Sequence, residues 1–88
     1  MIVWENGFKK YRMQDITDEY LLHIAISIER KKGNPKYLTK ENLKMIYDEL
    51  YLRGVIGYFK YISCRMFGGK LYGTIVFNKK NCEQIYRV

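Results

Sequence analysis

The residues best suited to chemistry lie in the last third of the chain, where aromatic and basic side chains are interleaved. Residues 51–88 contain seven Lys or Arg and a single acidic residue, Glu83, so nearly all of the net charge of +7 falls there. Cations bind phosphate groups, and flat rings stack on bases. This part of the sequence therefore predicts a surface for an anionic ligand that carries a base.

Six side chains form the predicted ligand site. Three are rings on which a base can stack, and the other three are cations that bind phosphate, Arg as a planar fork and Lys as a point charge. In a second interpretation, the same rings are cross-strand pairs that stabilise a sheet, or are buried by helices or a second subunit. The six residues are Tyr61, Arg65, Phe67, Lys70, Tyr72 and Arg53.

Catalytic and metal-binding constellations are weak in this sequence. The only histidine, His23, precedes Ser27 by four residues, a spacing that indicates a solvated pair on one helix face more than a nucleophile and its base. No glycine-rich phosphate loop is present, since Gly68-Gly69 lacks the helix that must follow it. The two cysteines, 64 and 82, form no CxxC or Cys/His group. We expect a protein that is not an enzyme and has no metal or cofactor.

The first half of the chain predicts a β-hairpin and then two helices. The Asn6-Gly7 pair between apolar runs favours a hairpin over residues 2–13. Asp15 or Thr17 can cap a helix that continues to about Lys32 and stops at residues 33–35.

The second helix is expected from Lys40 to Arg53. Thr39 precedes it as a cap, and Gly54 follows it where left-handed geometry favours glycine. Each predicted helix carries one apolar stripe at helical spacing, which is typical of a core-facing surface.

The C-terminal part predicts a second hairpin. Residues 55–67 and 71–78 are rich in β-forming side chains and flank Gly68-Gly69, the expected two-residue loop. Pairing across this loop places Cys64 on a buried face, and Arg65 with the rings on the opposite face. Residues 83–88 can add a short strand. The expected fold is α+β: an N-terminal β-hairpin, two helices and a C-terminal antiparallel β-hairpin, packed as one small domain of sheet and helices over residues 1–88.

A winged-helix fold is the competing architecture. It requires three helices before a two-stranded wing, and the sequence shows two, because residues 35–38 are too few for a third.

Three apolar residues lie outside the two helical stripes and predict an oligomer interface. An 88-residue chain buries a small share of its surface, so self-association would add stability. Scattered surface apolar residues are the alternative. The three positions are Ile26, Met45 and Leu52.

Targeting signals and membrane spans are not expected. Met1 is followed by Ile-Val-Trp-Glu, without a basic segment or a long apolar run. We expect a protein without a membrane partner that acts in the host cytoplasm.

An ordered set of short motifs in the first 55 residues resembles small phage-encoded proteins. It comprises Trp4 with Asn6-Gly7, the run from Met13 to Leu22, Ile28-Glu29-Arg30, and Tyr47 followed by Glu49-Leu50 and Arg53-Gly54. The pattern has histidine where Tyr20 stands and asparagine where His23 stands. The chain is somewhat similar to the Thoeris anti-defence sponges, oligomeric proteins that sequester cyclic ADP-ribose-type signals. The resemblance implies a phage anti-defence protein that binds its ligand without turnover.

Three functions are compatible with these residues. The first is a sponge that sequesters an anionic nucleotide signal of host immunity. The second is a nucleic-acid-binding module, either a wing-like regulator or an anti-CRISPR inhibitor that binds an effector complex. In the third, the rings are hot spots that bind a host defence protein.

Overall fold

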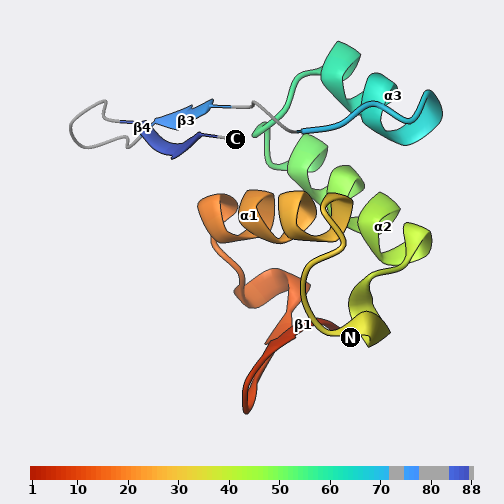
Figure 1. The fold of residues 1–88 in the computed structure, drawn as a ribbon. Coiled ribbons are helices and arrows are strands. Elements are labelled where there is room, and N and C mark those ends of the chain that lie inside the picture. The colour runs from red at the N-terminus through yellow and green to blue at the C-terminus, as the bar shows by residue number, and fades with distance from the viewer. Residues whose placement is uncertain (72–74, 78–83, 88) are drawn as a thin grey trace.

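The computed structural model describes residues 1–71, 75–77 and 84–87 and has an α+β fold (Figure 1). A two-stranded antiparallel sheet opens the chain and three α-helices follow. The elements are β1 (Ile2–Asn6), β2 (Lys9–Arg12), the 3-10 helix η1 (Met13–Asp15), α1 (Asp18–Glu29), the 3-10 helix η2 (Pro35–Tyr37), α2 (Lys40–Leu52), α3 (Tyr58–Met66), β3 (Ile75–Phe77) and β4 (Gln84–Arg87).

The N-terminal hairpin is present, but its turn lies one residue later than predicted. Asn6 pairs with Lys9, so Gly7 and Phe8 form the two-residue loop. Gly7 has φ +66°, and Phe8 is not among the residues with positive φ. Positive φ at the first loop position alone is typical of a type II′ turn, whereas the predicted Asn-Gly turn needs it at both.

Threonine caps start α1 and α2, as predicted. The Thr17 hydroxyl accepts from the Tyr20 amide at 3.3 Å, and the Thr39 hydroxyl accepts from the Asn42 amide at 3.1 Å. Both hydroxyls satisfy amides that the first helical turn leaves without carbonyl partners.

The C-terminus of α1 comes one turn before the predicted Lys32. Lys31 adopts φ +57°, and the amides of Lys31 and Lys32 bond back to the carbonyls of Ile28 and Ser27. This is the Schellman pattern, which closes a helix. Gly54 at φ +75° closes α2 in the same way, as its position predicted.

The prediction that residues 55–67 form the first strand of a C-terminal hairpin is wrong, because residues 58–66 form the helix α3. Tyr61 and Cys64 turn toward the rest of the protein three positions apart, which is helical spacing. Nine of the thirteen side chains from 55 to 67 are apolar or aromatic, so a period of two could not be told from a period of 3.6. Gly68 and Gly69 follow the helix and are not a hairpin loop. The expected count of two α-helices is therefore also wrong.

β3 and β4 pair antiparallel with each other, with Ile75 opposite Arg87. They fall within the predicted strand segments 71–78 and 83–88. The partner of β3 is thus β4 and not residues 55–67. Tyr72 and Cys82 lie outside the described residues.

The core is centred on α1, which lies between the N-terminal hairpin and the C-terminal strands in Figure 1 and packs against α2. Six of its twelve side chains are buried and apolar, so other parts of the protein cover more than one face of this helix. Ile26 is one of them, which corrects its assignment to an oligomer interface. Met45 is half-buried against the core, and Leu52 is 78% exposed. The fully buried side chains are Val3, Leu21, Leu22, Ile24, Ile46, Leu50 and Leu71.

Candidate functional site

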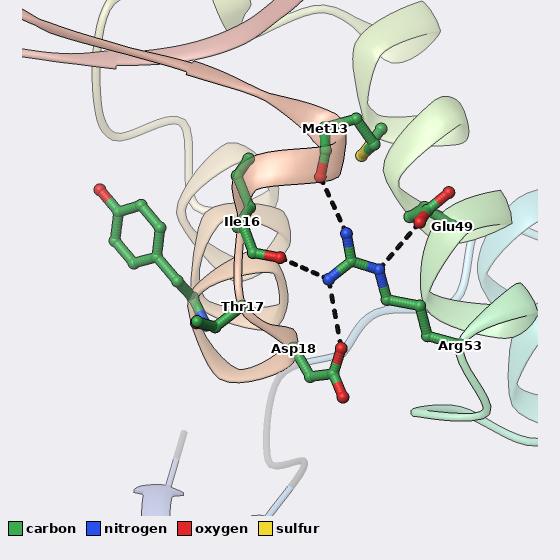
Figure 2. A network of polar contacts seen from close by, with 7 residues as sticks. Met13, Ile16, Thr17, Asp18, Glu49 and Arg53 are labelled. Carbon is green, nitrogen blue, oxygen red and sulfur yellow. Dashed lines mark hydrogen bonds and ion pairs between the residues drawn. The ribbon is translucent and has the colours of Figure 1, made fainter.

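Arg53, one of the six predicted ligand residues, is engaged within its own chain (Figure 2). Its Nε donates to Glu49 at 2.8 Å, and its terminal nitrogens donate to Asp18 and to the carbonyls of Ile16 and Met13 at 3.2, 2.5 and 2.8 Å. Burial alone would lower the pKa of Arg53, but the two carboxylates outweigh it and raise that pKa. Arg53 joins the end of α2 to the start of α1.

Tyr61 and Arg65 share a carboxylate that the sequence analysis did not connect with them. The Tyr61 hydroxyl donates to Asp48 at 2.7 Å, and the Arg65 Nε lies 3.0 Å from the same oxygen. The hydrogen bond to Asp48 raises the pKa of Tyr61. The Tyr61 ring stacks on Tyr51 at 4.5 Å, so its face is covered by another ring. Asp48 of α2 is therefore an acidic neighbour of Arg65.

Phe67 and Lys70 follow α3. Phe67 is the C-cap of α3 and is 80% exposed, and Lys70 is exposed two residues after Gly68. The hairpin face predicted to carry Arg65 and the rings does not form, because Tyr58–Met66 is a helix.

The structure nevertheless brings two of the six residues, Arg65 and Lys70, to one hollow. This cationic groove has a volume of about 300 Å³ and lies between α2 and the segment that follows α3. It is lined by Lys40, Leu43, Lys44, Tyr47, Cys64, Arg65, Gly68, Gly69 and Lys70. Four of these nine described lining residues are basic and none is acidic.

Within the groove, Arg65 keeps donors for a ligand. Among the described residues its contacts to Asp48 and Tyr61 use only Nε, so both terminal nitrogens can form a bidentate contact with phosphate. Lys40 and Lys44 are exposed and four residues apart, so they lie on one face of α2. The spacing of these lysines was visible in the sequence, but only α3 shows that they face the same hollow as Arg65.

One wall of the groove consists of residues 68–70, and backbone hydrogen bonds at Gly69, Lys70 and Leu71 hold it in place. The Gly69 amide donates to the Ser63 carbonyl at 2.6 Å, and the Lys60 ammonium donates to the Lys70 carbonyl at 2.8 Å. The Leu71 amide donates to both carboxylate oxygens of Glu29, at 2.8 and 3.0 Å. The wall is therefore tied to α3 and to the end of α1.

Glu29 is the buried carboxylate beneath the groove. It also accepts a hydrogen bond from the hydroxyl of Tyr47, one of the lining residues. Burial raises the pKa of Glu29, against the opposing effects of Tyr47, the Leu71 amide and the charges of Lys70 and Lys60. Burial, with the charge of Glu29, also raises the pKa of the Cys64 thiol, so the prediction of a buried Cys64 is confirmed and the thiol is held protonated.

A second hollow of about 470 Å³ lies between the N-terminal hairpin, α1 and the loop after α1. Its lining mixes Glu5 with Lys32 and includes His23 and Ser27. Because both signs of charge are present, it matches an anionic ligand less well than the cationic groove does. Within the described part of the chain, no group of His, Cys, Asp and Glu side chains is arranged to hold a metal ion, and no helix is long and apolar enough to cross a membrane.

Comparison with known protein families, with curated proteins and with solved structures finds no match to this chain. The site is therefore interpreted from its own geometry.

Proposed function

We propose that the protein is a non-enzymatic binding protein whose cationic groove holds a small nucleotide through its phosphate groups. The observation that carries this proposal is the convergence of Lys40, Lys44, Arg65 and Lys70 on one hollow with no acidic lining residue. Cations held in a concave site concentrate an anion there. A volume of about 300 Å³ lies at the lower end of small-molecule sites.

The resemblance to phage anti-defence proteins suggests the biological role of this binding. In that role the ligand is a nucleotide signal of host immunity, and the protein removes it from solution in the host cytoplasm. Tight binding without turnover is sufficient for that role. Nothing in the groove has to supply a nucleophile, which agrees with the protonated state of Cys64.

Calorimetry with ADP-ribose as the probe tests the proposal. Lys40→Ala/Lys44→Ala should weaken binding at least tenfold, since one charged hydrogen bond contributes roughly 1.5–3 kcal/mol and 1.4 kcal/mol is about tenfold. Lys9→Ala/Lys10→Ala is the matched control, because it removes the same charge from the exposed hairpin. Equal losses in both double variants, or no binding by the wild type, would contradict the proposal.

Nucleic-acid binding is the second candidate, either as a wing-like regulator or as an inhibitor of a CRISPR effector. It is favoured by cations that lie beyond the groove, such as Lys9, Lys10 and Lys36, and by the third helix, which the winged-helix alternative required. An extended polyanion contacts many cations and releases many counterions, so its affinity falls steeply with salt, whereas a nucleotide with two phosphates gives a shallow dependence. A single-stranded oligonucleotide titrated at several salt concentrations separates the two candidates.

Mass spectrometry of small molecules released from the purified, denatured protein would identify a bound nucleotide directly. For this measurement the protein is produced in cells whose immune signalling is active. The sponge proposal predicts one nucleotide near equimolar to protein, and a strongly reduced amount from Lys40→Ala/Lys44→Ala.

A further inference from the structure

The second hollow, of about 470 Å³, is separate from the cationic groove and shares none of its lining residues. The N-terminal hairpin, one side of α1 and the loop that follows α1 enclose it (Figure 1). A hollow of this volume is within the range of small-molecule sites. We call it the hairpin pocket. Its walls include Trp4, Glu5, Tyr20, His23, Lys32 and Asn34.

Two rings of α1 form one wall of the hairpin pocket. Tyr20 and His23 are three positions apart, so they project from the same side of the helix. Their centroids are 6.2 Å apart and their planes differ by 15°, and His23 is exposed. Tyr20 also contacts Tyr11 of the hairpin at 5.2 Å between centroids. Because the two rings are nearly parallel, a flat ligand that lies on one of them is parallel to both.

Two polar side chains beside the rings are held by the chain and keep hydrogen-bonding capacity. Glu5 accepts the hydroxyl of Tyr37 through Oε2, so its Oε1 can accept from a ligand. Asn34 accepts the Lys36 amide through Oδ1 at 3.0 Å, so its NH2 group can donate. The hairpin pocket therefore offers both an acceptor and a donor.

The charges of the hairpin pocket favour a ligand without net charge. Glu5 and Lys32 both line it and have opposite signs. An anion would be attracted by Lys32 and repelled by Glu5, and a cation would meet the reverse. A neutral, flat ligand with its own donors and acceptors avoids both repulsions.

We propose that the hairpin pocket binds a nucleobase that carries an exocyclic amino group, as adenine does. The base stacks on the rings of Tyr20 and His23. Its amino group donates to Glu5, and a ring nitrogen accepts from Asn34, which are the contacts that carboxylates and amides make with base edges. The base can belong to a free nucleoside or to an unpaired nucleotide of a single strand. Because the cationic groove takes no part, this inference does not depend on the proposed function.

Adenosine and inosine are the probes, and Trp4 is the reporter, since it is the only tryptophan and lines the hairpin pocket. The two nucleosides share ring system and sugar, but inosine has an oxygen where adenosine has the amino group. Adenosine should change Trp4 fluorescence saturably. Inosine should bind about tenfold more weakly or worse, because its oxygen faces the Glu5 carboxylate without a donor. Ribose alone should leave the fluorescence unchanged.

Glu5→Gln tests the contact with the amino group. The glutamine oxygen can still accept from Tyr37, and its NH2 group would then face the ligand. The preference should therefore reverse, so that inosine binds more tightly than adenosine. A purely structural role of Glu5 would instead weaken the binding of both nucleosides equally, which would contradict the proposed contact.

A short oligoadenylate distinguishes the two sources of the base. Binding tighter than that of adenosine, with an affinity that falls steeply with salt, would assign the hairpin pocket to single-stranded nucleic acid. Equal or weaker binding would assign it to a free nucleoside.

His23→Ala should weaken adenosine binding about fivefold or more, the effect of losing one stacking ring. Phe59→Ala is the matched control, because it also removes an exposed ring from a helix but lies outside the hairpin pocket. Lys40→Ala/Lys44→Ala should likewise leave adenosine binding unchanged. The proposal would be overturned by a wild type whose fluorescence does not respond to adenosine, by equal affinities for adenosine and inosine, or by normal binding in His23→Ala.

Discussion

At the scale of single residues, Arg53 has a structural role that its type and position in the sequence did not reveal. It has five N–H donors and makes four hydrogen bonds, to two carboxylates and two backbone carbonyls. Met13 belongs to η1 and Ile16 lies between η1 and α1, so Arg53 reaches both carbonyls from the C-cap of α2. We conclude that Arg53 fixes the end of α2 against the start of α1.

Replacing Arg53 tests this role. Arg53→Ala should lower the free energy of unfolding by about 2–3 kcal/mol, because hydrogen bonds to a charged group are lost in a partly buried place. Arg12→Ala is the comparison, since the Arg12–Asp15 pair is exposed and such pairs contribute about 0–1 kcal/mol. Urea denaturation measures both. Equal small losses would show that the Arg53 network contributes little.

Glu29 makes stability depend on pH with a definite sign. Burial raises its folded pKa above the usual value of 4.5, so the folded state holds the proton more tightly than the unfolded state does. The stability that Glu29 contributes is therefore complete below pH 4.5 and is lost as the pH rises through the raised pKa. The wild type should lose stability relative to Glu29→Gln over that window, as measured by urea denaturation at a series of pH values. A difference that stays constant with pH would contradict the shift.

At the scale of elements, the groove wall depends on a glycine that contacts α3. A Cβ on Gly69 would lie 2.9 Å from both the carbonyl carbon and the carbonyl oxygen of Ser63, so the wall would have to move. Gly69→Ala should cost about 1–3 kcal/mol, as overpacking does, and should weaken ligand binding. Gly57→Ser is the control, because a Cβ there meets nothing within 4 Å and serine suits an N-cap. It should leave stability unchanged or higher in thermal denaturation.

The elements that the sequence predicted well are those specified by neighbouring residues. The caps Thr17 and Thr39 and the C′ glycine Gly54 act through contacts a few positions away, so their types and places suffice. The hairpin was found from the same kind of signal, with an error of one residue in the turn.

The elements predicted wrongly depend on distant parts of the chain. Residues 58–66 had no decisive period, and their helix is stabilised by packing on α2 and by the contacts of Tyr61 and Arg65 with Asp48. Ile26 was assigned to the surface because one apolar stripe was expected on α1, whereas α2 and β4 both contact that helix and Ile26 is buried. For the site, the residue types were informative, but Lys40 and Lys44 join it only through the tertiary fold.

At the scale of the whole molecule, Trp4 links the hairpin to the helical part. It is the only tryptophan and is buried against Tyr37 and Gly33, where a Cβ on Gly33 would lie 2.5 Å from the indole. We predict that Trp4 fluorescence and helical circular dichroism change together in urea, as in a single cooperative unit. A fluorescence transition at lower urea would show that the hairpin detaches before the helices unfold.

The hydrogen bonds from the Leu71 amide to Glu29 also bear on the order in which parts of the fold form. They join residues 42 positions apart, whereas α1 and α2 are completed by local contacts. Contacts that close long loops form late, because the chain must lose more entropy first. During synthesis the two helices can form while the groove is still missing its wall. A fragment that ends at Met66 should therefore form α1 and α2 but lack the groove wall, and under the proposed function it would not bind the nucleotide.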